Sequence, residues 1–103
     1  MPKARHPIDP VPPAPLTAVE AAYIKQVVRR YYGDDAVVRN YGPDPDRLDL
    51  HVETNRAPGL ERDECLGLLM CEVVRDYISL EVLKRGDRIR GSSKLAYRQG
   101  EVL

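Results

Sequence analysis

The segment Arg47-Leu48-Asp49-Leu50-His51-Val52-Glu53-Thr54 alternates apolar and polar side chains, and this alternation decides the architecture around it. A period of two is typical of a β-strand with one buried face and one solvated face. The aliphatic side chains lie on one face, and Asp49, His51 and Glu53 lie on the other. Because helical patterns precede and follow this strand, the sequence predicts an α+β fold in which helices cover one face of a small sheet.

The chain upstream of this strand carries the signals of a helix and a hairpin. Thr17 and Glu20 have the spacing of a capping box, and apolar side chains recur every four residues until Gly33, a typical helix terminator. We therefore predict a helix over 18–32. A β-rich stretch at 36–41 and a turn with two prolines then predict an antiparallel hairpin with the first strand described above.

Downstream, an apolar face with i, i+3, i+4, i+7 spacing predicts a second helix that begins at residue 60 or 61. Alternation at 78–83 predicts a third strand, and the residues after the turn at 85–87 are predicted to add strand segments at 88–90 and 94–98. The expected fold is a two-layer α+β sandwich of α-β-β-α-β-β order. Its two helices would pack on one face of a mixed or antiparallel sheet.

Proline marks the beginning of the chain. Six of the nine prolines precede Leu16, and such a segment has little to bury and few backbone donors. We predict a disordered proline-rich tail over 1–16, a solvated leader rather than a docking ligand, and a single domain over 17–103. With no Trp and no Phe the core of that domain is modest, which makes self-association plausible.

The polar face of the central strand is the first candidate site. A carboxylate, an imidazole and a second carboxylate are suitable groups for acid–base chemistry, for a metal or for binding a partner. Asp49, His51 and Glu53 are therefore the candidate interaction face. The favoured alternative is a solvated sheet face with cross-strand ion pairs to Arg39 or to an arginine of the hairpin after the third strand.

The basic C-terminal segment is the second candidate site. Formal net charge is zero, but residues 34–64 carry nine acids against four arginines, and residues 84–103 carry six bases against two acids. Basic side chains with one aromatic could meet phosphates and stack on an RNA base. Charged protection of an exposed sheet edge is the favoured alternative. The candidate RNA or phosphate contacts are Arg88, Arg90, Lys94, Tyr97 and Arg98.

Several other functions are not expected. Residues 86–94 resemble a phosphate-binding loop only in outline, since the lysine is misplaced and too few residues follow. Cys65 and Cys71 face different directions on one helix, so we expect reduced thiols, a cytoplasmic location and no metal site. No cofactor is expected, and no apolar run is long enough for a membrane span.

One family resemblance can be stated. The hairpin ending at Glu53, the following helix and Ile78-Ser79-Leu80-Glu81-Val82 resemble the layout of the minimal nucleotidyltransferases. That family has a Gly-Ser turn between its first strands and an Asp-x-Asp pattern on the second. Asp49 matches one metal-binding aspartate, but Gly42 is followed by proline and the second aspartate is out of phase, at Asp46. The resemblance therefore implies no more than an inactive relative.

The sequence favours a non-catalytic interaction or accessory module that binds a protein partner or itself through the open sheet face or edge. Charge reversal at Asp49 or Glu53 is then expected to perturb assembly and leave the fold intact. RNA binding by the sheet and the basic segment is the alternative. An enzyme is the third hypothesis, since it needs His51 and nearby carboxylates to converge.

Overall fold

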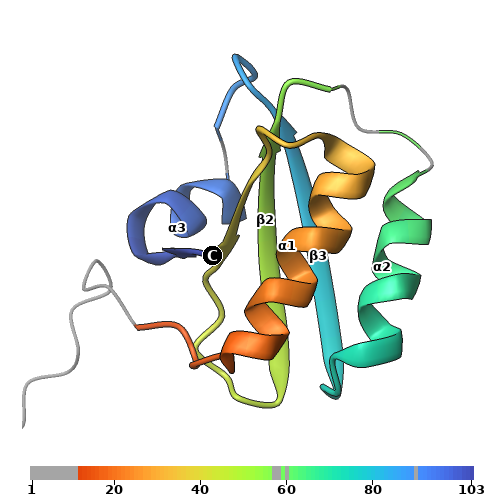
Figure 1. The fold of residues 1–103 in the computed structure, drawn as a ribbon. Helices are drawn as coiled ribbons and strands as arrows, with labels where there is room; N and C mark the ends of the chain where they lie inside the picture. The colour runs from red at the N-terminus through yellow and green to blue at the C-terminus, as the bar shows by residue number, and fades with distance from the viewer. Residues whose placement is uncertain (1–11, 57–58, 60, 90) are drawn as a thin grey trace, which may run out of the picture.

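A computed structural model describes residues 12–56, 59, 61–89 and 91–103. This part of the chain forms a small α+β domain with three helices and a four-stranded mixed sheet (Figure 1). The elements are α1 (Ala18–Tyr32), β1 (Val37–Asn40), β2 (Arg47–Thr54), α2 (Glu61–Glu72), β3 (Tyr77–Lys84), α3 (Ser92–Gln99) and β4 (Glu101–Val102).

The strands lie in the order β3-β2-β1-β4. β1 and β2 form the predicted antiparallel hairpin, with Arg39 opposite His51. β3 runs parallel to β2, with Glu81 opposite His51, so α2 is the crossover between them. β4 pairs antiparallel with β1. β2 is therefore central and long, whereas β3 forms one edge of the sheet.

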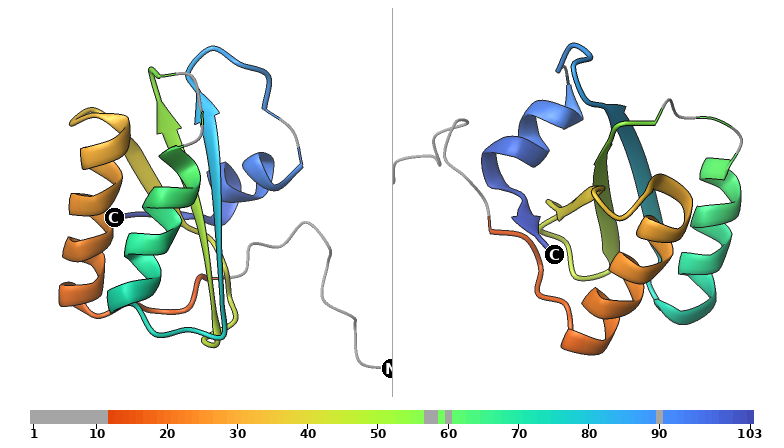
Figure 2. Two further views of the ribbon diagram at one scale, coloured as in Figure 1. Left: turned by 90° about the vertical axis from the view of Figure 1, so that its right-hand side faces the viewer. Right: turned by 45° about the horizontal axis from the view of Figure 1, so that its top comes forward.

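The core lies between one face of this sheet and the helices α1 and α2. Figure 2 shows both helices on the same side of β2 and β3. The aliphatic half of the β2 alternation points toward them and is almost fully buried. Two helices therefore pack on one sheet face, as predicted. The predicted two-layer sandwich of α-β-β-α-β-β order is matched only in part, because a third helix, α3, lies between β3 and β4 in the chain. The main core residues are Ile24, Val28, Leu48, Leu50, Val52, Cys65, Leu69, Ile78 and Leu80.

The predicted beginning of α1 is confirmed atom by atom. The hydroxyl of Thr17 accepts from the amide of Glu20 at 3.1 Å, and the Glu20 carboxylate accepts from the amide of Thr17 at 3.1 Å. These bonds satisfy backbone donors that the first helical turn cannot use. At the other end, Gly33 adopts a φ of 101°, which favours glycine, and its amide donates to the carbonyl of Arg29.

The prediction of strand segments after β3 is wrong for most of that region. Residues 92–99 form α3, which packs against the sheet face opposite α1 and α2 (Figure 2), and only 101–102 form a strand. Ser93 and Ala96, one helical turn apart, are its buried contacts. Neither is a large apolar residue, so the buried side of this helix lacks the aliphatic stripe that usually indicates a helix packed on a sheet. Residues 88 and 89 form no strand, and Arg90 lies outside the described residues.

The predicted tail lies largely outside the described residues. Of its described part, Ala14 donates to the carbonyl of Gly42 at 2.8 Å and accepts from the Asn40 amide group at 2.9 Å. Leu16 packs against the core. The tail boundary at residue 16 stays a prediction.

Candidate functional site

His51 lies at the centre of the polar face of β2, and α3 covers it. Its exposed fraction is 0%, and its Nε2 atom lies 3.0 Å from the hydroxyl oxygen of Ser93 on α3. That hydroxyl donates to the carboxylate of Glu81 on β3 at 3.0 Å. Ser93 therefore links α3 to two neighbouring strands, and the face that was expected to be solvated is closed at this point.

This chain of hydrogen bonds fixes the tautomer of His51. The one hydroxyl proton of Ser93 is donated to Glu81. The Nε2 atom of His51 must then carry a proton and donate to Ser93, which leaves Nδ1 as an acceptor. Nδ1 is buried and has no hydrogen-bond partner among the described residues. Burial lowers the pKa of His51, and the nearby Glu81 carboxylate opposes this only in part.

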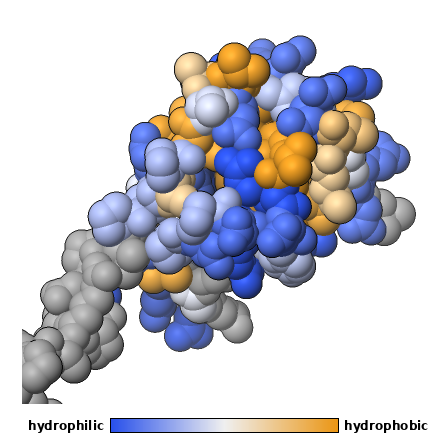
Figure 3. Space-filling view, turned by 90° about the horizontal axis from the view of Figure 1, so that it is seen from below, coloured by the Kyte–Doolittle hydropathy of each residue, from blue (hydrophilic) through white to orange (hydrophobic). Residues whose placement is uncertain are grey.

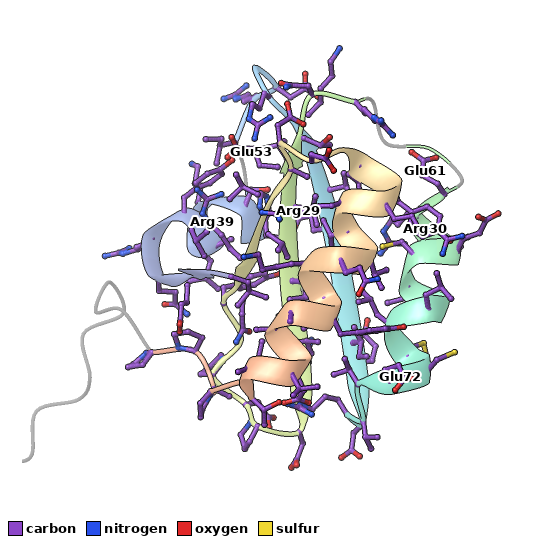
Figure 4. The ribbon with its side chains drawn as sticks, viewed as in Figure 1. Arg29, Arg30, Arg39, Glu53, Glu61 and Glu72 are labelled. Atoms are coloured by element: carbon purple, nitrogen blue, oxygen red, sulfur yellow. The ribbon has the colours of Figure 1, made fainter. Side chains whose placement is uncertain are left out.

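Glu53 is the centre of a second cluster on the same face. Its carboxylate accepts from the Tyr97 hydroxyl, from Arg39 at 3.2 Å and from Arg85 at 2.9 Å. Figure 4 labels Glu53 and Arg39, which lie near each other on the same side of the molecule. The hydrogen bond from Tyr97 is the main cause that lowers the pKa of Glu53, with support from the two arginines. Burial and this carboxylate raise the pKa of Tyr97 to about 12. The ion pairs expected as the alternative are confirmed, but they are half-buried rather than solvated.

Asp49 completes the predicted set and is engaged separately. Its carboxylate accepts from Ser79 at 2.7 Å and from Arg47 at 3.0 Å. Asp49, His51 and Glu53 thus share one strand face, as predicted, but each meets different partners. Among residues 12–56, 59, 61–89 and 91–103, no group of three or more His, Cys, Asp or Glu side chains is placed to hold a metal ion.

The basic C-terminal residues divide into two groups. Arg88, Lys94 and Arg98 are exposed, whereas Arg90 lies outside the described residues. Tyr97 is half-buried, with its ring 5.3 Å from that of His51 and 4.4 Å from the Arg39 guanidinium. Because the segment is helical, its cations do not line one strand face. Their contact with RNA stays a prediction.

The edge of β3 has a different character from the polar face. The strand has eight residues and ends the sheet, so one row of its backbone groups faces away from β2. The orientation is fixed by Arg62 of α2, whose Nε atom donates to the carbonyl of Leu80 at 2.7 Å. Because backbone groups alternate along a strand, those of Ile78, Val82 and Lys84 face the same way as those of Leu80.

An apolar stripe borders this edge. At about 100° per residue, Leu66, Met70 and Val74 follow one side of α2 and its end, and Leu68 lies on the roughly opposite side, where its carbonyl accepts from the Tyr23 hydroxyl of α1. Leu66 is partly buried and also packs against the core. Met70 is 62% exposed and Val74 is 85% exposed. Tyr77, at the beginning of β3, is 57% exposed. Figure 3 shows apolar side chains surfacing among polar ones at the lower end of the molecule. The apolar spacing of this helix in the sequence did not distinguish this stripe from the buried face.

Comparison of the chain with protein-family models, with curated proteins and with solved structures gave no match. Within the described part of the chain, no helix has the length and apolar character needed to cross a membrane.

Proposed function

We propose that the chain is a non-catalytic interaction module that self-associates through the edge of β3 and the adjoining stripe of α2. The observation that supports this is the eight-residue edge strand beside exposed Met70 and Val74. An added strand supplies the main-chain hydrogen bonds that the edge lacks, and apolar side chains beside it supply burial.

The polar face supports this choice by contrast. His51 and Ser93 are buried, and Glu53 already accepts from three side chains. A binding site gains from groups that are unsatisfied before the partner arrives, and these groups are largely satisfied within the domain. The outer edge of β3 instead presents backbone groups that face no neighbouring strand, beside the exposed side chains of Met70 and Val74.

Sedimentation equilibrium from low micromolar to millimolar protein tests the proposal. We expect the average mass to rise with concentration, and the double variant Met70→Glu plus Val74→Glu to shift the transition at least tenfold higher. The matched control is Leu95→Glu, which places the same charge on an exposed apolar position of α3, away from β3. Circular dichroism checks that each variant is folded. A monomer mass at every concentration would refute self-association.

RNA binding is the second candidate, favoured by the exposure of Arg88 and Lys94. Neutralisation of phosphates by these cations would make the affinity fall steeply between about 50 and 200 mM salt. Fluorescence anisotropy with short single-stranded and duplex RNA measures this. Salt-sensitive binding that the double variant Arg88→Glu plus Lys94→Glu abolishes would favour this candidate, and no binding at high micromolar protein would remove it.

A further inference from the structure

We propose that two copies of the chain pair their β3 strands antiparallel about a two-fold axis at Leu80, and that Arg62 is a latch that must leave the Leu80 carbonyl first. This inference rests on the proposed function, and it specifies the geometry and the regulation of that same edge. The pairing would make one continuous sheet from the two four-stranded sheets.

The outward row of backbone groups restricts the possible registers. Within β3, only the backbone groups of even-numbered residues face outward, so even residues must lie opposite even residues of the second copy. Two registers of this kind overlap the strand almost completely. One is centred on Leu80 and the other on Glu81.

Charge distinguishes these two registers. The Glu81-centred register places the carboxylates of the two Glu81 residues directly opposite each other, which is destabilising. The Leu80-centred register places Glu81 opposite Ser79 instead. It also brings Asp76, which precedes β3 and whose amide donates to the carbonyl of Asp46, beside Lys84 at the end of the paired region. The two-fold axis repeats this pair. Both residues are exposed in the single chain and carry opposite charges.

The same axis brings α2 of each copy onto one face of the joined sheet, side by side. The apolar stripe of Leu66, Met70 and Val74 would then face the same stripe of the second copy. Gly67 lies next to this stripe, and a Cβ atom built on it meets nothing within 4 Å. Glycine inside a helix costs about 1 kcal/mol relative to alanine. Packing within the chain does not account for Gly67, whereas close approach of a second helix does.

Arg62 occupies the centre of the proposed pair. Its bond to the Leu80 carbonyl takes the acceptor that the second copy's Leu80 amide would use. The latch therefore opposes pairing and protects the edge of the single chain. Once formed, the symmetric pair uses the outer edge of β3 in both copies. No outer β3 edge is then left to bind a third copy, so assembly through this edge stops at the dimer.

Charge exchange tests the register. We expect Asp76→Lys and Lys84→Asp each to raise the dimer dissociation constant about tenfold, because each replaces two attractions by two repulsions. The double variant exchanges the charges and is expected to restore the original value. Asp87→Lys, an exposed acid outside the paired residues, is the control. Monomers throughout would refute self-association itself, whereas a dimer that ignores the exchange would refute only this register.

Replacement of the latch tests the second half of the proposal. Arg62→Ala removes the competing donor, so we expect a dimer about tenfold tighter than that of the parent chain. Thermal unfolding monitored by circular dichroism establishes that the variant is folded at the temperature of the sedimentation run. A folded variant with unchanged or weaker dimerisation would overturn the role of Arg62.

Discussion

The two sides of β2 differ in how their polar groups are satisfied. Toward β1 and α3, the charged side chains meet each other and are covered, with Glu53 and His51 at the centres of two small networks. Toward β3, the sheet ends in a row of backbone groups, and Arg62 caps the carbonyl of Leu80. A conspicuous cluster of ionisable side chains can thus be structural. The outer edge of β3, which carries fewer ionisable side chains, is the better candidate for an interaction surface.

The largest effect is expected from breaking the closed side at Glu53. Glu53→Gln removes the charge that three donors share, and leaves the two half-buried arginines without it. We expect the free energy of unfolding to fall by about 2–3 kcal/mol, measured by urea denaturation. Dimerisation should not change, since this carboxylate lies away from the edge of β3.

Asp87→Asn is the matched control for Glu53→Gln. Asp87 is an exposed acid that borders the same surface hollow as Glu53. A loss of less than 0.5 kcal/mol is expected there, roughly as for other surface substitutions. Equal losses in the two variants would mean that the network at Glu53 contributes nothing specific.

The next largest effect concerns the direction in which β3 backbone groups point. Val82→Pro removes an amide that faces outward, so we expect weaker dimerisation with a loss of only about 1 kcal/mol in stability. Leu83→Pro removes an amide that faces β2 and so breaks a hydrogen bond of the sheet, so we expect a loss of about 2 kcal/mol. Sedimentation and urea denaturation of the pair measure both quantities. Similar stabilities for the two variants would contradict the alternation on which the edge assignment rests.

The main fold could be predicted because its signals are local. The alternation of β2 and the capping box of α1 each lie within a few residues. The first indicates a strand through its period of two, and the second indicates the beginning of a helix through its hydrogen bonds. The hairpin follows from the turn between β1 and β2. These elements required no knowledge of distant contacts.

The closed state of the polar face could not be predicted in the same way. Whether His51 is solvated depends on α3, which begins about 40 residues later and buries Ser93 and Ala96. The buried side of α3 carries small side chains instead of an aliphatic stripe, and the charged residues around them favoured the prediction of an edge strand. The only hint of this helix in the sequence was the spacing of two small residues, Ser93 and Ala96, one helical turn apart. The edge position of β3 likewise depends on strand order, which no local pattern encodes.

A smaller effect is expected at the link between α3 and the sheet. Ser93→Ala removes the hydroxyl that joins His51 to Glu81, and leaves a buried donor on His51 unpaired. We expect a loss of about 1–2 kcal/mol, together with faster amide hydrogen exchange in α3 than in α1. Unchanged exchange in α3 would mean that other contacts, such as Tyr97 with Glu53, are sufficient to hold it.

The smallest effect is expected in the pH dependence of the free energy of unfolding, to which His51 contributes. Burial lowers its pKa in the folded chain, so the unfolded chain binds the proton more readily. Its contribution to stability is therefore complete above the unfolded pKa of about 6.5 and is lost as the pH falls below that value. Burial and the charge of Arg39 lower the pKa of His51, whereas Glu81 and Glu53 raise it, and the net direction is downward. His51→Gln can keep a donor toward Ser93 without titrating. We expect the free energy of unfolding of the parent chain to fall more than that of the variant between about pH 7.5 and 5.5 in urea denaturation. Parallel curves would show that the buried imidazole accepts its proton without opening α3, and that this face is less tightly closed than its hydrogen bonds indicate.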